Sequence, residues 1–267
     1  MKKAWVQVLG AGEAFSEREG NTAFWFRSND PSLPEFLVDC GYQVPERYWR
    51  ALRRERIGKR SRSLQGVFFT HLHADHAFGI VPLLVRFWEE SRRETLLIAG
   101  PRGVRSYVER LLDLGYPGLR EKLSFPLVFH EWKSSETWSW SGLRVRCAST
   151  RHSVPNYCLR IEGEGFSFAV SGDGGLTVRV KELLAGVGVH FQECYTAEPR
   201  FPTHADLRTS LSMFQAIGNP RLLVFTHLQR SEEVRIRTLL KALRPRGLRV
   251  KIARSGQIFL LSDFKSI

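Results

Sequence analysis

The sequence predicts an α/β protein in which two packed β-sheets carry helices on their outer faces. Two observations lead to this fold class: short apolar, β-rich runs alternate with helical patterns along the chain, and two packed sheets accommodate this many strands. No linker rich in proline, glycine or serine divides the 267 residues, so we expect a single domain over residues 1–267. Hydrophobic residues (43%) and aromatic residues (12%) supply a core and argue against disorder.

Apolar runs of strand length give the expected strands, and amphipathic patterns give the expected helices. Strands are expected at 4–9, 23–27, 35–40, 66–70, 95–99, 143–149, 157–161, 166–171, 189–194, 221–226 and 257–261. Helices are expected at 45–57, 76–90, 103–114, 204–217 and 231–243. The third of these helices has Val104, Val108 and Leu112 at helical spacing, so that one face is apolar.

The chain is strongly basic, with a net charge of +13 and 40 Lys and Arg residues, most of them Arg. Arginine binds oxyanions through its planar fork, and a positive field steers anionic substrates, although a compositional bias toward arginine is an equal alternative. The densest run, 47–62, falls on the expected helix 45–57 and its continuation. The apolar stripe Val44, Tyr48 and Leu52 turns most of these arginines to solvent. We therefore expect a solvated helix face, with an RNA-facing patch as the alternative.

Several classes of protein are disfavoured by what the chain lacks. A membrane span needs about 20 consecutive apolar residues, whereas charge-free stretches such as 209–220 are far shorter. The basic start at Lys2 and Lys3 is followed by a strand pattern rather than the apolar region of a signal peptide. The four cysteines are scattered, without a Cys-x-x-Cys pair, so we expect buried free thiols and a cytoplasmic protein.

The strongest chemical signal is the segment His71-Leu72-His73-Ala74-Asp75-His76, which directly follows an expected strand. It offers four metal ligands within six residues at a turn from strand to helix. Imidazole suits zinc, and alternate residues leaving a strand can converge on one cation while the next two point elsewhere. One loop can therefore serve two metal ions.

Further ligands are expected from distant segments. His152 and Asp173 each follow an expected strand, and His227 ends the segment 223–228, which echoes 67–72 in ending a buried strand with Thr-His-Leu. If the two strands occupy related places, both histidines leave the core at the same edge. His130 and His190 have no supporting pattern and are expected to be structural.

His204 has a different context. Thr203 and Asp206 resemble a helix N-cap with an acidic residue three positions later, so His204 is expected in the first turn of the helix 204–217. A histidine there would lie beside backbone amides at the positive end of the helix dipole, which favours an anion.

Together these segments resemble a known family. The run 70–84 resembles the signature loop and helix of the metallo-β-lactamase-fold hydrolases. The other motifs of that family are matched, in order, by Leu9 to Gly12, Asn21-Thr22, Arg151 to Pro155, Ser171 to Asp173 and Phe225 to His227. Specifically, these segments resemble ribonuclease Z, the tRNA 3′-endonuclease, and related phosphodiesterases, including armless ones. The resemblance covers essentially the whole chain and implies a four-layer αββα sandwich.

The resemblance also implies roles for the matching residues. His71, His73 and His152 would hold one metal ion, Asp75, His76 and His227 a second, and Asp173 would bridge two Zn²⁺, with Mn²⁺ as the alternative. A water or hydroxide between the ions would be the nucleophile, with Asp75 orienting or deprotonating it. His204 would contact the phosphate as general acid or charge stabiliser.

The resemblance leaves the substrate open. Only 21 positions separate His152 from Asp173, where ribonuclease Z carries its tRNA-binding arm, and His204-Ala205-Asp206 departs from the His-x-Thr of that enzyme. We expect a zinc-dependent phosphodiesterase acting on an anionic nucleotide or RNA phosphodiester. The alternatives are an armless tRNA 3′-endonuclease, a lactone, thioester or sulfate-ester hydrolase, and a nucleic-acid-binding module with a relict metal site. No membrane partner is expected, and a homodimer is implied by the resemblance only.

Overall fold

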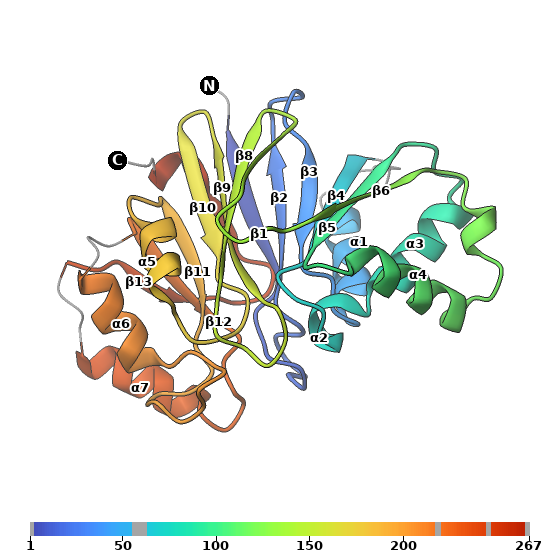
Figure 1. Ribbon diagram of the computed structural model, residues 1–267. Helices are drawn as coiled ribbons and strands as arrows, with labels where there is room; N and C mark the ends of the chain where they lie inside the picture. The colour runs from blue at the N-terminus through green and yellow to red at the C-terminus, as the bar shows by residue number, and fades with distance from the viewer. Residues whose placement is uncertain (1–2, 55–62, 217–219, 244–246, 265–267) are drawn as a thin grey trace.

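The computed structural model describes residues 3–54, 63–216, 220–243 and 247–264, and over these residues it has two seven-stranded sheets that pack face to face (Figure 1). Helices cover the outer face of each sheet. The layer order is therefore helix, sheet, sheet, helix, which confirms the predicted αββα sandwich.

The first sheet is built mainly from the N-terminal half of the chain. Its order is β14 (Ile258–Leu260), β1 (Ala4–Gly10), β2 (Ala23–Ser28), β3 (Glu35–Val38), β4 (Leu64–Phe68), β5 (Leu96–Gly100) and β6 (Leu127–Glu131). The strands from β3 to β6 run parallel to one another, while β1 pairs antiparallel with both β14 and β2. The carboxyl ends of β3, β4 and β5 consequently lie at one edge.

The second sheet mirrors the first. Its order is β13 (Val250–Ile252), β12 (Leu222–Thr226), β11 (Val189–Glu193), β10 (Phe166–Val170), β9 (Tyr157–Gly163), β8 (Leu143–Ser149) and β7 (Thr137–Trp140). The strands from β10 to β13 are parallel, and β7 to β10 form an antiparallel meander. Counted from the parallel edge of each sheet, β12 is the second strand and β4 is the third. The strands that lead into the repeated Thr-His-Leu pattern are therefore both interior but do not occupy equivalent places.

Three apolar clusters hold the layers together. The central one lies between the sheets, where the rings of Phe26 and Phe36 stack at 4.8 Å and those of Phe26 and Phe168 at 5.6 Å. The helices α1 (Val44–Arg54), α3 (Ile80–Glu89) and α4 (Val104–Gly115) cover the first sheet. The helices α5 (Val178–Leu184), α6 (Leu207–Ala216) and α7 (Glu233–Leu243) cover the second. The short elements are α2 (Ala74–Ala77) and the 3₁₀ turns η2 (Arg120–Lys122) and η3 (Leu261–Phe264).

The expected helix 76–90 is wrong in one respect, because the chain forms two helices, α2 and α3, that are separated at Gly79. The Gly79 amide donates to the Cys40 carbonyl at 2.8 Å rather than to a carbonyl one helical turn back. A Cβ on Gly79 would lie 2.1 Å from the Gly41 carbonyl oxygen. Close packing on the loop after β3 therefore interrupts the helix, and periodicity alone does not reveal this.

The expected helix 204–217 is also corrected. α6 begins at Leu207, and the Asp206 carboxylate accepts the Thr209 amide at 2.8 Å, which makes Asp206 the capping residue. His204 therefore lies in the loop before the helix and not in its first turn. Residue 217 is outside the described residues.

Other expected elements differ from the structure by one to three residues or were missed. β4 lies at 64–68 rather than 66–70, and β3 ends at Val38 rather than at residue 40. The elements that the sequence did not indicate are short or half-exposed: β6, β7, β13 and α5. α1 buries Val44, Tyr48 and Leu52 and exposes Arg50, Arg53 and Arg54, as expected for a solvated face. The continuation of the arginine-rich run over 55–62 is outside the described residues.

The four cysteines agree with the expectation of buried free thiols. Cys40, Cys147, Cys158 and Cys194 are all buried and free. In the described part of the chain, no helix is both long enough and apolar enough to cross a membrane.

Candidate metal centre

The candidate site lies where strands of both sheets end at a common edge. Its residues follow or end these strands: Asp39 follows β3, His71 follows β4, His152 follows β8, Asp173 follows β10, Glu193 ends β11 and His227 follows β12. The rings of His71 and His227 both lie against His76, with centroid distances of 4.1 and 5.3 Å. The expectation that the two Thr-His-Leu segments deliver their histidines to one edge is therefore confirmed.

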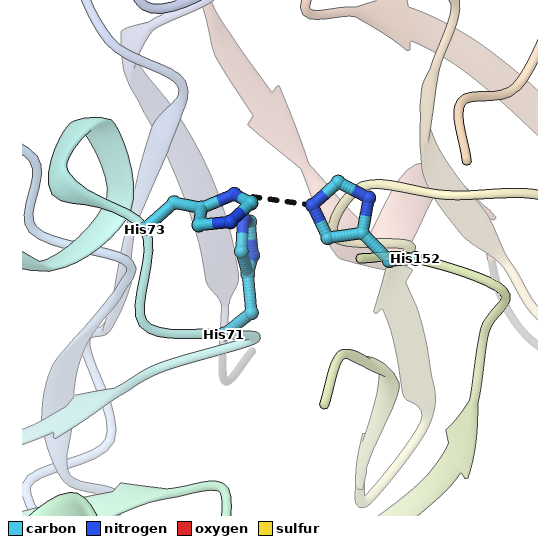
Figure 2. A group of neighbouring side chains, drawn as sticks. All are labelled: His71, His73 and His152. Atoms are coloured by element: carbon cyan, nitrogen blue, oxygen red, sulfur yellow. Dashed lines mark hydrogen bonds between the residues drawn. The ribbon is translucent and has the colours of Figure 1, made fainter. Parts of the chain in front are cut away.

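The first group of ligands consists of His71, His73 and His152, whose ligand atoms lie within 4.8 Å of one another. Figure 2 shows the imidazoles of His73 and His152 approaching from two different loops, with His71 on the same loop as His73. His73 Nδ1 lies 3.1 Å from His152 Nε2. The His71 Nε2 is buried without a hydrogen-bond partner. Three imidazole nitrogens thus converge on one point.

The second group consists of Asp75, His76 and His227, and Asp173 lies against it. His76 Nε2 is 3.4 Å from each of three atoms, the His227 Nε2, the Asp75 Oδ2 and the Asp173 Oδ1. His227 Nε2 is 3.4 Å from Asp75 Oδ2 and 3.5 Å from Asp173 Oδ2. The ligands of a tetrahedral zinc ion, with bonds of 2.0–2.1 Å, stand about 3.3–3.4 Å apart. The ligand atoms of Asp75, His76 and His227, each 3.4 Å from the other two, therefore have the spacing expected around a single ion.

The second nitrogen of each key imidazole is anchored, which fixes the nitrogen that faces the centre. His152 Nδ1 donates to the Thr203 carbonyl at 2.7 Å, so its Nε2 is unprotonated and free to bind. His76 Nδ1 donates to the Asp39 carboxylate at 2.9 Å, again leaving Nε2 for a metal. Such outer partners orient metal-binding histidines and raise their basicity. The donor set and its tautomers thus fit divalent cations.

Asp39 connects the two groups. Its carboxylate accepts the Thr70 amide at 2.8 Å and the Thr70 hydroxyl at 2.9 Å, besides the imidazole of His76. The Thr70 hydroxyl oxygen lies 3.0 Å from His71 Nδ1 and can accept its proton. One fully buried carboxylate therefore orients a ligand of each group. Sequence reasoning placed Asp39 inside a strand, and no local pattern marks it as a site residue.

Electrostatics distinguishes the two groups. Burial, together with the neighbouring imidazoles, holds the pKa of His71 well below its usual value, and burial lowers the pKa of His73 and His152, so these three imidazoles are neutral as ligands must be. Burial would also lower the pKa of His76, but the carboxylates of Asp173, Asp39 and Asp75 raise it well above its usual value. The second group therefore attracts positive charge.

His204 lies beside the metal ligands and is held by a residue that sequence reasoning missed. Its Nδ1 donates to Glu193 Oε1 at 2.5 Å, and the other Glu193 oxygen accepts the amides of Gly174 at 2.5 Å and Ala205 at 2.9 Å. Burial opposes protonation of His204, but the Glu193 carboxylate raises the pKa of His204 above its usual value. His204 can therefore present a proton from Nε2 to an oxyanion.

The other two histidines lie outside this cluster, as expected. His190 is buried, bonds Gln192 at 2.9 Å, and has its pKa lowered to about 4 by burial. His130 stacks on Trp138 with a centroid distance of 4.1 Å. Neither belongs to a group of ligand atoms in the described residues.

Curated relatives match a little over half of the chain. Ribonuclease Z of Staphylococcus carnosus is 29% identical over 159 residues, 59% of this chain and 49% of that protein. Ribonuclease Z of Mycobacterium marinum is 30% identical over 166 residues, 57% of each chain. The chain spans about half the length of the curated relatives it matches. The expected resemblance to the ribonuclease Z-like branch is confirmed.

Solved structures confirm the fold over nearly the whole chain. The metallo-β-lactamase fold protein YhfI from Bacillus subtilis superposes with a TM-score of 0.76 at 19% identity, covering 97% of this chain and 99% of that one. The short form of human tRNase Z gives a TM-score of 0.74 at 19% identity, covering 96% and 98%. A diphosphatase of the PhnP family gives 0.68 at 18% identity, covering 96% and 97%.

A narrower relationship comes from the family description "Anti-Pycsar protein Apyc1", which matches residues 4–234. The matched region holds every residue of the two ligand groups, together with Asp39, Glu193 and His204. The chain therefore has the metallo-β-lactamase fold and belongs to the Anti-Pycsar protein Apyc1 family.

Proposed function

We propose that the protein is a metal-dependent phosphodiesterase that holds two zinc ions and hydrolyses a nucleotide phosphodiester. The observation that carries the proposal is the position of Asp173. Its ligand atoms belong with His71 and His76 in one group and with Glu193 and His227 in another. A carboxylate shared by two sets of ligands is suited to bridge two cations.

The ligands divide as the resemblance implies. His71, His73 and His152 would hold one ion, and Asp75, His76 and His227 the other. Bound divalent ions supply a lowered pKa for water and charge stabilisation at the phosphoryl oxygens. Manganese is the alternative to zinc.

The remaining chemistry belongs to the side chains. Burial raises the pKa of Asp75, but His76 and His227 outweigh this and hold it well below its usual value, so Asp75 is ionised and can orient or deprotonate the attacking water. His204, protonated through Glu193, donates to the phosphate or to the leaving oxygen. Asp75 and His204 would therefore serve as the base and the acid of the reaction.

A small substrate is favoured over tRNA. The residues between His152 and Asp173 form the hairpin β9–β10, whose strands pair from Phe166 with Gly163 to Val170 with Leu159. This matches the expectation of a hairpin and nothing more in place of an arm. The ribonuclease Z relatives keep an armless tRNA 3′-endonuclease as the second candidate. A lactone, thioester or sulfate-ester hydrolase on the same metal core is the third.

A parallel activity screen decides among these candidates. Metal-loaded protein is assayed with cyclic nucleotides, bis(p-nitrophenyl) phosphate, precursor tRNA and a lactone. We expect turnover of the phosphodiesters and none of the lactone. Preferential cleavage of precursor tRNA would instead establish the endonuclease, and lactone hydrolysis alone would refute the proposal.

The roles of the site residues are tested by two substitutions and one control. Wild-type protein should carry about two ions, and Asp173→Ala should lose at least one of them. His204→Ala should keep its metal but lose about 10²- to 10⁴-fold in turnover of phosphodiesters. His130→Ala, a half-buried histidine outside the cluster, should change neither. Undiminished turnover in His204→Ala would show that this histidine does not contact the reacting phosphate.

A further inference from the structure

The loop between β11 and α6 carries an aromatic wall beside His204. The Tyr195 ring stacks on the His204 ring, with centroids 4.3 Å apart and planes 23° apart. The Phe201 ring meets Tyr195 nearly edge-on at 5.7 Å and lies 6.3 Å from His204. Phe201 nevertheless leaves 37% of its surface exposed. A partly exposed phenyl ring therefore lies next to the group proposed to contact the phosphate.

The loop fixes this wall in place. Its two ends are joined by backbone bonds, from Tyr195 N to Ala205 O and from Leu207 N to Thr196 O, both at 2.9 Å. Within the loop, the Glu198 carboxylate accepts two hydrogen bonds from the Arg208 guanidinium, from Nε at 2.6 Å and from Nη2 at 2.7 Å. The Thr203 carbonyl of the same loop anchors the ligand His152. The exposure of Phe201 is therefore a feature of a braced loop that also supports the metal centre.

The chemistry of the wall suits a flat, aromatic, electron-rich group. The Arg200 guanidinium carbon lies 5.4 Å from the Phe201 centroid, so a cation accompanies the ring. Every nucleobase offers a π-face that stacks on aromatic side chains, and arginine adds a cation–π contribution. A single nucleotide carries such a base one ribose away from its phosphate, which matches the short separation of Phe201 from His204.

We propose that Phe201, braced by Tyr195 and accompanied by Arg200, is the platform on which the base of the substrate stacks. The proposal rests on the proposed function, because it needs the phosphate of the same substrate at His204. It makes Phe201 a specificity-determining residue that separates nucleotide phosphodiesters from diesters without a base. The proposed contacts, Phe201 with the base and His204 with the phosphate, come from one loop, and the Thr203 carbonyl of that loop also accepts the hydrogen bond of His152.

The test compares two ligands that share a ribose phosphate but differ in the base. Dissociation constants of adenosine 5′-monophosphate and ribose 5-phosphate are measured by calorimetry on the metal-loaded wild-type protein and its variants. Phe201→Ala should weaken the nucleotide about 5- to 100-fold and leave ribose 5-phosphate unchanged. Phe201→Trp should restore binding of the nucleotide. Tyr116→Ala removes an aromatic ring of similar exposure at the end of α4 and should change neither constant.

The outcomes separate this inference from the proposed function. Equal loss for both ligands in Phe201→Ala, or no loss for either, would overturn the base platform while the phosphate site stands. Failure of ribose 5-phosphate and the nucleotide to bind wild-type protein would overturn both. A change in oligomeric mass in Phe201→Ala, with both constants unchanged, would assign the ring to an interface and would overturn the platform.

Discussion

At the scale of single residues, Asp39 influences both ligand groups although it belongs to neither of them. It contacts no reacting atom, yet its two oxygens set the orientation of His76 directly and of His71 through Thr70. Because these histidines belong to different ligand groups, one buried carboxylate couples the geometry of both proposed ions.

Asp39→Asn tests this coupling. The amide keeps the shape of the side chain but loses the charge and presents a donor to one of its partners, so both ligands lose their orientation. We expect metal affinity to fall about 10- to 100-fold, as for other outer partners of metal ligands. Competition with a chelator measures it. Asp30→Asn is the control, since Asp30 is also buried and hydrogen-bonded, to Ser32, but lies in the loop between β2 and β3. Equal loss of metal in both variants would contradict a specific role.

Glu193→Gln tests the protonation of His204. The carboxylate raises the pKa of His204, so its removal should lower that pKa. An acid that donates its proton loses activity as pH rises through its pKa, and the alkaline limb of the pH–rate profile should therefore move to lower pH in the variant. The profile of kcat with a phosphodiester measures the shift. Glu162→Gln, a partly buried glutamate paired with Arg160, should leave the profile in place. An unmoved limb in Glu193→Gln would mean that another group sets it.

At the scale of elements, the site depends on the close contact between the loop after β3 and the loop after β4, which includes the short helix α2. The Cys40 amide donates to the His76 carbonyl at 2.7 Å, and a Cβ on Gly41 would lie 1.9 Å from the Asp75 carbonyl oxygen. No side chain fits between these backbones. The glycine therefore permits the approach that brings Asp39 to His76.

Gly41→Ala should separate the two loops. The clash involves backbone on both sides, so it cannot be relieved by a rotamer change, and overpacking of this kind costs about 1–3 kcal/mol of stability. We expect a lower melting temperature and weaker metal retention together. Gly115→Ala is the matched control, because a Cβ there comes no closer than 3.3 Å, to Val81. Normal stability and metal content in Gly41→Ala would show that the loops can move apart freely.

The sequence predicts those site residues whose motif lies within one short segment, and it misses those that only the fold brings together. The ligands between His71 and His76 lie in one segment, and the resemblance supplies His152, Asp173 and His227. Asp39 and Glu193 carry no such signal, because their partners are brought to them by the order of strands in each sheet. His204 was placed in the right region, but the wrong residue was expected to open the helix, since Thr203 and Asp206 are both plausible caps in sequence.

The fold is predictable to a similar degree and for a similar reason. A continuous apolar run predicts a buried strand such as β10, and apolar residues at helical spacing predict an amphipathic helix such as α4. The strands β6 and β7 lie at sheet edges, and their mixed exposure hides the apolar run that marks a strand. The break at Gly79 arises from contact with Gly41, thirty-eight positions earlier, which no local pattern contains.

At the scale of the whole molecule, the net charge of +13 is spread over a surface whose described part has arginines at several places around the metal centre. Arg151 precedes His152 and is exposed, Arg200 accompanies Phe201, and Arg230 pairs with Glu13 near His227. The charge therefore fits an anionic substrate of any size. Its dependence on salt is what distinguishes a small substrate from a polynucleotide.

The final prediction uses this dependence. A polynucleotide that neutralises several basic side chains releases one counterion for nearly every phosphate contacted, so the logarithm of its affinity falls steeply with the logarithm of the salt concentration. A mononucleotide has no condensed counterion atmosphere and engages the site through one phosphate, so we expect a much shallower slope. Inhibition constants of adenosine 5′-monophosphate and of a transfer RNA are measured against a phosphodiester substrate over a series of salt concentrations. A shallow slope with tight nucleotide binding supports the small substrate. Tight binding of the RNA with a slope several times steeper would instead assign the basic surface to RNA and favour the endonuclease.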